Sequence, residues 1–167
     1  MSTSQPAVRP SPYQFVAIPT EIAEAVRATL ASPRYGHPAH VETATGHGPC
    51  RHCLRAFRVG EERRILFTYD AFDGVERLPQ PGPVFVHADA CPRYDAAAGF
   101  PDDLRAHALT LVAYGRGRAH RAEAHVAGAA VEPALDALFA RPDVHYVHVR
   151  DTRAGCYDLR VERAGPA

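Results

Sequence analysis

The sequence predicts an α+β fold in which a mainly antiparallel sheet packs with two principal helices. Two segments carry apolar residues at the spacing of amphipathic helices, one beginning at Thr20 and one covering residues 131–139. The β-type runs around them are short and are joined by turns rich in glycine and proline, which favours hairpins over parallel crossovers. Helices set apart from such hairpins are typical of α+β proteins.

The N-terminal segment is expected to contain one strand and the first helix. Residues 13–18 form a β-type run, and the segment after it has an apolar helical stripe. Thr20 is expected to cap this helix, and Ser32-Pro33 to end it. Residues 33–49 are rich in proline, glycine and histidine, so they are expected to be irregular.

Residues 64–69 and 83–87 are predicted to pair as a central hairpin. Both runs are rich in branched and aromatic residues, and the loop between them contains several glycines and prolines. Cys91-Pro92 is expected to start a short helix after the hairpin, because proline suits a first helical turn. Two more strand pairs are predicted in the C-terminal half, at residues 109–114 and 118–126 and at residues 144–149 and 157–161.

The composition excludes several classes of enzyme. All 19 basic residues are arginine, whereas Schiff-base enzymes, pyridoxal-phosphate enzymes, P-loop NTPases and protein kinases all need a lysine. The net charge is +0 with the histidines neutral, which gives no electrostatic signature for nucleic acid. No apolar run reaches the ~18 residues of a membrane span. We therefore expect no nucleic-acid and no membrane partner, and a cytoplasmic location in which thiols stay reduced.

Three of the four cysteines fall in two short clusters that have the spacing of zinc ligands. Cys50 and Cys53 form a C-x-x-C motif, and His87 and Cys91 form an H-x-x-x-C motif. A tetrahedral zinc takes thiolate and imidazole ligands in such pairs, and the central hairpin would bring the two clusters together. The predicted fold therefore includes a small zinc-knuckle-like hairpin.

Other interpretations of these clusters stay open at this point. One alternative is that the cysteines are free thiols that bind no metal. Another is that Cys50 and Cys53 form a redox-active dithiol. Within the metal interpretation, His52 and Asp89 lie inside the clusters and are candidates to replace a ligand.

The chain length of 167 residues suits one domain. Residues 1–12 contain no apolar signal-peptide core and are expected to form a disordered tail. Residues 13–167 are expected to form a single α+β domain, within which residues 48–98 are a possible metal-clipped hairpin subregion.

His148, Arg150 and Cys156 form a second candidate site near the C-terminus. In a small enzyme, Arg150 would hold an anionic substrate group and His148 would move protons beside Cys156. A small thiol on a strand is also typical of simple packing. No G-x-S-x-G, H-E-x-x-H or G-x-G-x-x-G motif is present in the chain.

Five short motifs carry a resemblance to a known family. They are Gly48-Pro49-Cys50-Arg51-His52-Cys53-Leu54, Gly60-Glu61, Gly82-Pro83-Val84-Phe85-Val86-His87, Tyr146-Val147-His148-Val149-Arg150 and Gly155-Cys156-Tyr157. With them, most of the chain from about Tyr13 onward resembles the uncharacterised bacterial family called domain of unknown function 1203. The resemblance implies a small soluble bacterial protein and brings no activity with it.

These observations favour a binding or accessory module that is stabilised by a structural zinc and has an unknown protein or small-molecule partner. The alternative is a small enzyme that uses His148, Arg150 and Cys156 on a small anionic substrate. The two differ at the metal, since four protein ligands leave a zinc no open position, whereas a catalytic zinc keeps one for water.

Overall fold

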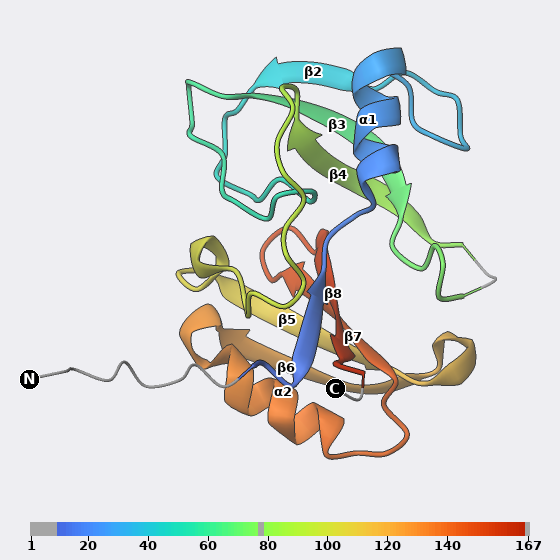
Figure 1. Cartoon of the computed structure of the whole chain (residues 1–167), viewed down its shortest axis with the longest axis vertical. Coiled ribbons are helices and arrows are strands. Elements are labelled where there is room, and N and C mark those ends of the chain that lie inside the picture. The colour runs from blue at the N-terminus through green and yellow to red at the C-terminus, as the bar shows by residue number, and fades with distance from the viewer. Residues whose placement is uncertain (1–9, 77–78, 166–167) are drawn as a thin grey trace, which may run out of the picture.

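The chain folds into two lobes that lie one above the other in Figure 1. The architecture is that of a computed structural model, which describes residues 10–76 and 79–165. We define the small-sheet lobe as residues 18–91 and the large-sheet lobe as residues 10–17 together with residues 99–165.

The small-sheet lobe consists of one helix and a three-stranded antiparallel sheet. Its elements are α1 (Thr20–Thr29), β2 (His40–Thr43), β3 (Arg63–Asp70) and β4 (Pro81–His87). The strands are arranged in the order β2-β3-β4. Ile65 and Phe67 of β3 lie opposite Val86 and Val84 of β4, and all four are buried. Alternate residues of the two strands therefore face the core of this lobe.

The large-sheet lobe consists of a five-stranded antiparallel sheet and one helix. Its elements are β1 (Tyr13–Val16), β5 (Ala108–Tyr114), β6 (His120–Ala127), α2 (Val131–Phe139), β7 (Tyr146–Asp151) and β8 (Tyr157–Arg163), with single 3-10 turns at Asp102–Leu104, Arg116–Arg118 and Gly128–Ala130. The strand order is β1-β8-β7-β5-β6. The first strand of the chain thus pairs with the last, which places the two ends of the described chain side by side.

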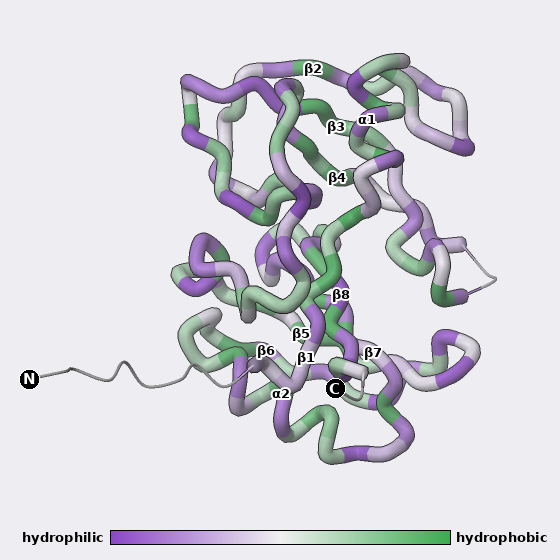
Figure 2. The backbone as a smooth tube through the Cα atoms, in the orientation of Figure 1, coloured by the Kyte–Doolittle hydropathy of each residue, from purple (hydrophilic) through white to green (hydrophobic). Residues whose placement is uncertain are grey.

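Each lobe has an apolar core of its own. In the large-sheet lobe, Leu111, Val149 and Leu159 of the sheet pack with Leu135 of α2. The small-sheet core contains residues of α1, β3 and β4 and also two of the cysteines, Cys50 and Cys53. Figure 2 shows hydrophobic residues along β3, β4 and β8, inside their lobes.

Arg51 connects the two lobes through buried polar contacts. Its Nε donates to the carbonyl of Tyr157 and its Nη1 to the carbonyl of Pro49, both at 2.7 Å. Its Nη2 lies 3.0 Å from Oδ1 of Asp158, whose side chain is only 1% exposed. Burial raises the pKa of Asp158 to about 6, although Arg51 acts in the opposite direction. Because each partner would be a costly buried charge without the other, the pair disfavours arrangements of the lobes that separate them.

The predicted class and most predicted elements are confirmed. The structure has two principal helices and antiparallel sheets, and the hairpins β3–β4, β5–β6 and β7–β8 form where the sequence predicts them.

Three local expectations are wrong. Thr20 does not cap α1, because the helix follows Pro19 without a side-chain cap and the hydroxyl of Thr20 instead contacts Nε2 of His52 at 3.0 Å. No helix begins at Cys91-Pro92, and residues 91–100 contain none. Residues 33–49, which were expected to be irregular, contain the edge strand β2.

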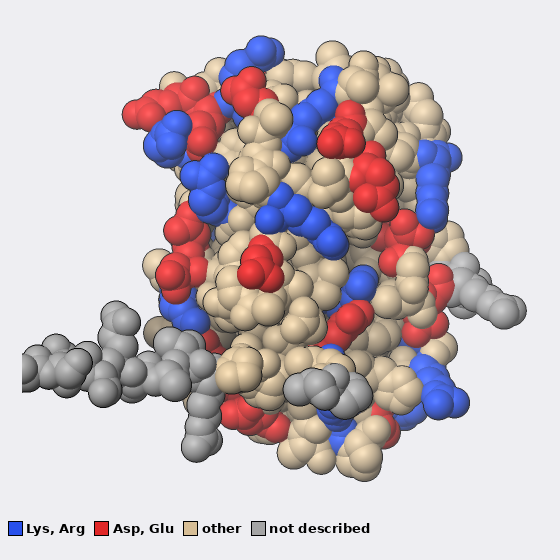
Figure 3. Space-filling model, in the orientation of Figure 1, with Lys and Arg blue, Asp and Glu red and all other residues tan. Residues whose placement is uncertain are grey.

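The sequence predicts a disordered N-terminal tail at residues 1–12. Residues 1–9 of this tail lie outside the described part of the chain. In the described remainder, Pro12 accepts a hydrogen bond from the backbone N–H of Ala164 at 2.8 Å. None of the helices in the described part of the chain is long and apolar enough to cross a membrane. The face shown in Figure 3 carries arginine and acidic side chains interspersed with one another.

Candidate metal centre

Four side chains with metal-binding atoms meet at the end of β4. The sulfurs of Cys50, Cys53 and Cys91 and a ring nitrogen of His87 all lie within 4.8 Å of one another. The sulfurs of Cys50 and Cys91 are 3.8 Å apart, and Sγ of Cys53 lies 3.4 Å from Nδ1 of His87. A tetrahedral zinc with Zn–S bonds of ~2.3 Å separates its sulfurs by roughly 3.8 Å. The spacing therefore suits a metal ion held between the four side chains.

The Cys50–Cys53 segment is a tight turn that is tied to β4. The N–H of Leu54 donates to the carbonyl of Cys50 at 2.8 Å, and the N–H of Arg51 donates to the carbonyl of Phe85 at 3.0 Å. Leu54 has a φ of 58°, in the left-handed region that is costly for a residue with a side chain. The burial of its side chain in the core of the large-sheet lobe offsets that cost.

His87 is oriented by a carboxylate on the side of the ring away from the sulfurs. Its Nδ1 faces Cys53, whereas its Nε2 lies 3.3 Å from Oε1 of Glu62. Glu62 accepts a hydrogen bond from the N–H of Arg58 at 2.8 Å. A carboxylate in this position fixes the tautomer and the ring plane of a metal-binding histidine. Burial acts to lower the pKa of His87, but the hydrogen bonds with Cys50 and Cys53 outweigh it and raise this pKa to about 10.

Two nitrogen groups approach Cys91, the least buried of the four residues. Nη2 of Arg27 donates to its sulfur at 3.2 Å, and Nε of Arg27 donates to the carbonyl of His87 at 3.0 Å. Nδ1 of His52 lies 3.3 Å from the same sulfur. Three thiolates around a divalent metal leave a net negative charge, which the guanidinium of Arg27 compensates.

The thiols of the centre differ in how easily they lose a proton without a metal. Burial opposes ionisation of Cys50, but hydrogen bonds with Cys53, Cys91 and His87 outweigh it and lower the pKa of Cys50. Hydrogen bonds with Cys50 and Cys53 raise the pKa of Cys91, and burial adds to this effect. A negative charge on Cys50 is thus stabilised by the groups that would bind the metal with it.

The other two residues of the sequence clusters lie outside the group of four. His52 is buried beside Cys91, with its second ring nitrogen toward Thr20, so it supports a ligand without completing the set. Asp89 is exposed. The sequence reasoning missed Arg27 and Glu62, which reach the centre from α1 and from the loop before β3.

Comparison with protein families assigns most of the chain. The family described as protein of unknown function (DUF1203) matches residues 47–163. The chain belongs to this family. The matched segment includes the four residues of the candidate metal centre and the three C-terminal candidates. The searches of curated proteins and of solved structures found no match.

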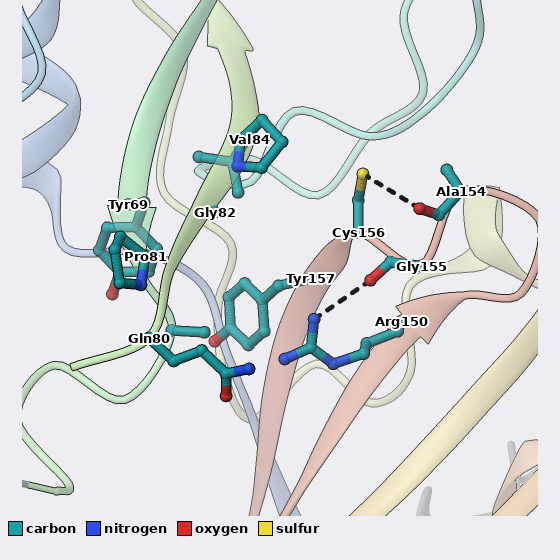
Figure 4. A pocket seen from close by; sticks show the side chains of 12 residues that line it. Tyr69, Gln80, Pro81, Gly82, Val84, Arg150, Ala154, Gly155, Cys156 and Tyr157 are labelled. Atoms are coloured by element: carbon teal, nitrogen blue, oxygen red, sulfur yellow. Dashed lines mark hydrogen bonds between the residues drawn. The ribbon is translucent and has the colours of Figure 1, made fainter. Parts of the chain in front are cut away.

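Arg150 and Cys156 line a common cleft, and His148 lies outside it. The cleft has a volume of about 180 Å³ and lies between the start of β4 and the end of the β7–β8 turn. Figure 4 shows Nη1 of Arg150 donating to the carbonyl of Gly155, at 3.1 Å, and the sulfur of Cys156 directed to the carbonyl of Ala154. Both side chains therefore contact the backbone of the β7–β8 turn.

His148 is enclosed by aromatic rings on the face of the large sheet toward the small-sheet lobe. It is 0% exposed, and neither ring nitrogen has a hydrogen-bond partner among the described residues. The ring centres of Phe72 and Tyr157 lie 4.7 and 4.9 Å from its own. Burial, with a smaller effect of Arg150 and Arg160, lowers the pKa of His148 well below its usual value. Because an unpaired polar group is costly to bury and a charged one costs far more, the ring is expected to stay neutral in this site.

We expect His148→Phe to remove part of the acid sensitivity of the fold. Because the pKa of His148 in the folded state lies below the unfolded value of ~6.5, the stability that the neutral ring contributes is lost as the pH falls below that value. At about pH 7.5 the variant should lie within about 3 kcal/mol of the wild type, since phenylalanine is larger than histidine but buries no polar atom that needs a partner. On acidification to about pH 5.5 it should lose less stability than the wild type.

Urea unfolding at the two pH values measures this difference. His145→Phe is the control, because His145 is exposed on the segment that enters β7. The same pH dependence in His148→Phe and in the wild type would contradict the assignment of His148 as a buried neutral ring.

Proposed function

We propose that this protein is a binding module whose small-sheet lobe is held together by a structural zinc at Cys50, Cys53, His87 and Cys91. The observation that carries the proposal is the closed donor set, in which three sulfurs and one imidazole nitrogen converge within 4.8 Å and three of the four residues are buried. Four protein ligands fill a tetrahedral zinc, so such a metal stabilises the fold and leaves no position for water.

The chemistry of the donors favours zinc over other metals. Thiolate and imidazole together suit zinc, whereas magnesium and calcium prefer oxygen ligands. The surroundings also suit a closed site, because Glu62 orients the imidazole of His87 and Arg27 offsets the charge of the thiolates. A reducing, cytoplasmic environment would keep the cysteines available for the metal.

The metal centre supports a binding role through Arg51. This residue lies between the ligands Cys50 and Cys53, and its side chain forms the buried contacts to Tyr157 and Asp158 of the other lobe. A metal that fixes the Cys50–Cys53 turn would therefore also fix the relative position of the lobes and the clefts between them.

Metal analysis tests the proposal directly. Protein purified without an affinity tag or added metal should contain about one zinc per chain. Of the four cysteines, Cys156 alone should react with a thiol reagent under native conditions, and the other three should react after chelation. A metal-free protein with four freely reacting thiols would contradict the zinc and leave the cysteines as ordinary core residues.

A further inference from the structure

A larger cleft lies between the lobes next to the one that Arg150 lines. Its volume is about 440 Å³, within the range of small-molecule sites. The small-sheet lobe contributes residues 46–49 and Phe85, and the large-sheet lobe contributes His107 and residues of the β7–β8 turn. Cys156 lines both clefts.

Four charged side chains line the larger cleft, and three of them have partners within the protein. Arg51 and Asp158 form the buried ion pair between the lobes. Oδ1 of Asp151 accepts a hydrogen bond from the N–H of Ala154 at 2.7 Å. Arg153 is exposed and makes no hydrogen bond or ion pair within the described part of the chain. The N–H bond leaves the negative charge of Asp151 in place, so the four side chains are neutral overall, and Arg153 is the cation of the cleft that has no partner among the described residues.

The walls near this charge are aromatic and apolar. His47 and His107 come from different lobes and stack face to face, with ring centres 4.1 Å apart and planes 5° apart. Burial and the neighbouring His47 lower the pKa of His107, which favours the uncharged ring. Pro49 and Phe85 add apolar surface. The cleft thus offers a flat aromatic wall beside the unpaired guanidinium of Arg153.

We propose that this cleft binds a small organic carboxylate, with its carboxylate group on Arg153 and its apolar body against Phe85 and the stacked histidines. The inference rests on the proposed binding function and names the class of ligand. A guanidinium matches a carboxylate through two parallel hydrogen bonds. Arg150 is less suited to this role, because it lines the smaller cleft and already donates to a backbone carbonyl.

Cys156 offers a reporter thiol for the test. Iodoacetate carries a carboxylate and iodoacetamide is its neutral counterpart, and each alkylates a thiolate with loss of iodide. The ratio of the two rate constants at Cys156, measured by mass spectrometry of its peptide, should exceed the ratio for free glutathione by roughly tenfold, because Arg153 holds the anionic reagent near the sulfur. Benzoate should slow the alkylation of Cys156 by iodoacetamide, and neutral benzamide should not.

Two arginine variants locate the effect. Arg153→Gln should reduce the ratio to that of glutathione, whereas Arg116→Gln should leave it unchanged, because Arg116 is exposed in the β5–β6 turn and does not line the cleft. A wild-type ratio equal to that of glutathione, or a raised ratio that survives Arg153→Gln, would overturn the proposal. Zinc content measured on the same samples separates the two proposals. A chain that contains zinc but whose Cys156 shows the same rate ratio as glutathione would contradict the carboxylate site and leave the zinc proposal intact.

Discussion

The Cys53→Ser variant should lose the zinc that we propose at this site, and with it more than about 4 kcal/mol of stability, because losses of that size are typical of a lost metal site. Cys53 is 4% exposed, and its sulfur faces Nδ1 of His87 at 3.4 Å. A serine hydroxyl is a poor replacement for a zinc thiolate, so the remaining polar ligands would converge in the core without a metal. In small metal-bound modules the binding free energy of the metal is also folding free energy. We therefore expect a lower melting temperature that added chelator no longer reduces.

Cys156→Ser is the matched control for this variant. Cys156 lies outside the cluster of four, is partly exposed and makes only a 3.8 Å contact to the carbonyl of Ala154. Its replacement should change the stability by at most about 0.5 kcal/mol and leave the zinc content unchanged. Thermal melts followed by circular dichroism, with elemental analysis of each sample, compare the two. A Cys53→Ser protein that keeps its zinc and melts with the control would show that the assignment of the metal is wrong.

The elements that the sequence predicts correctly are those whose pattern is local. The apolar spacing of residues 131–139 and the glycine-rich turns of the hairpins depend on near neighbours alone. The edge strand β2 has no such pattern, since its residues are exposed or half-buried and are held by pairing with β3. The segment after Cys91 is not helical for a related reason, since its hydrogen bonds go to distant parts of the chain. Nη2 of Arg93 donates to the carbonyl of Ala17 at 2.7 Å, and the backbone N–H of Tyr94 donates to the carbonyl of His52 at 2.8 Å.

The same distinction holds at the metal centre. Two short motifs with ligand spacing are enough to predict which four side chains converge. The groups that orient and neutralise them are far away in the sequence and carry no motif. Arg27 lies 64 positions before Cys91, and Glu62 belongs to an acidic pair that resembles an exposed loop. His148 is the opposite case. The sequence makes it a candidate for proton transfer because it is a histidine, but in the folded chain it packs against Phe72, which is distant in the sequence.

Arg51→Met should destabilise the protein by about 3–5 kcal/mol at neutral pH, whereas the four proposed zinc ligands are left unchanged. The change leaves Asp158 buried without its cation and removes the donors to the carbonyls of Tyr157 and Pro49. Arg34→Met is the control, since Arg34 pairs with Asp73 but is 65% exposed. Exposed pairs of this kind contribute about 0–1 kcal/mol. Urea unfolding and zinc analysis of both variants separate the loss of the ion pair from the loss of the metal.

The pH dependence of the Arg51→Met effect tests whether Asp158 carries the cost. Its folded pKa of about 6 lies above the unfolded value of ~3.9, so the stability contributed by the protonated carboxyl is present at low pH and is lost as the pH rises through about 6. Without Arg51 the folded pKa should rise further, so the variant should be penalised more at about pH 8 than at about pH 5. Asp158→Asn in the Arg51→Met background should then recover much of the loss at about pH 8, because a neutral amide is less costly to bury than an unpaired carboxylate. A loss that is independent of pH and is not recovered by Asp158→Asn would contradict this account and place the cost at the carbonyls of Tyr157 and Pro49.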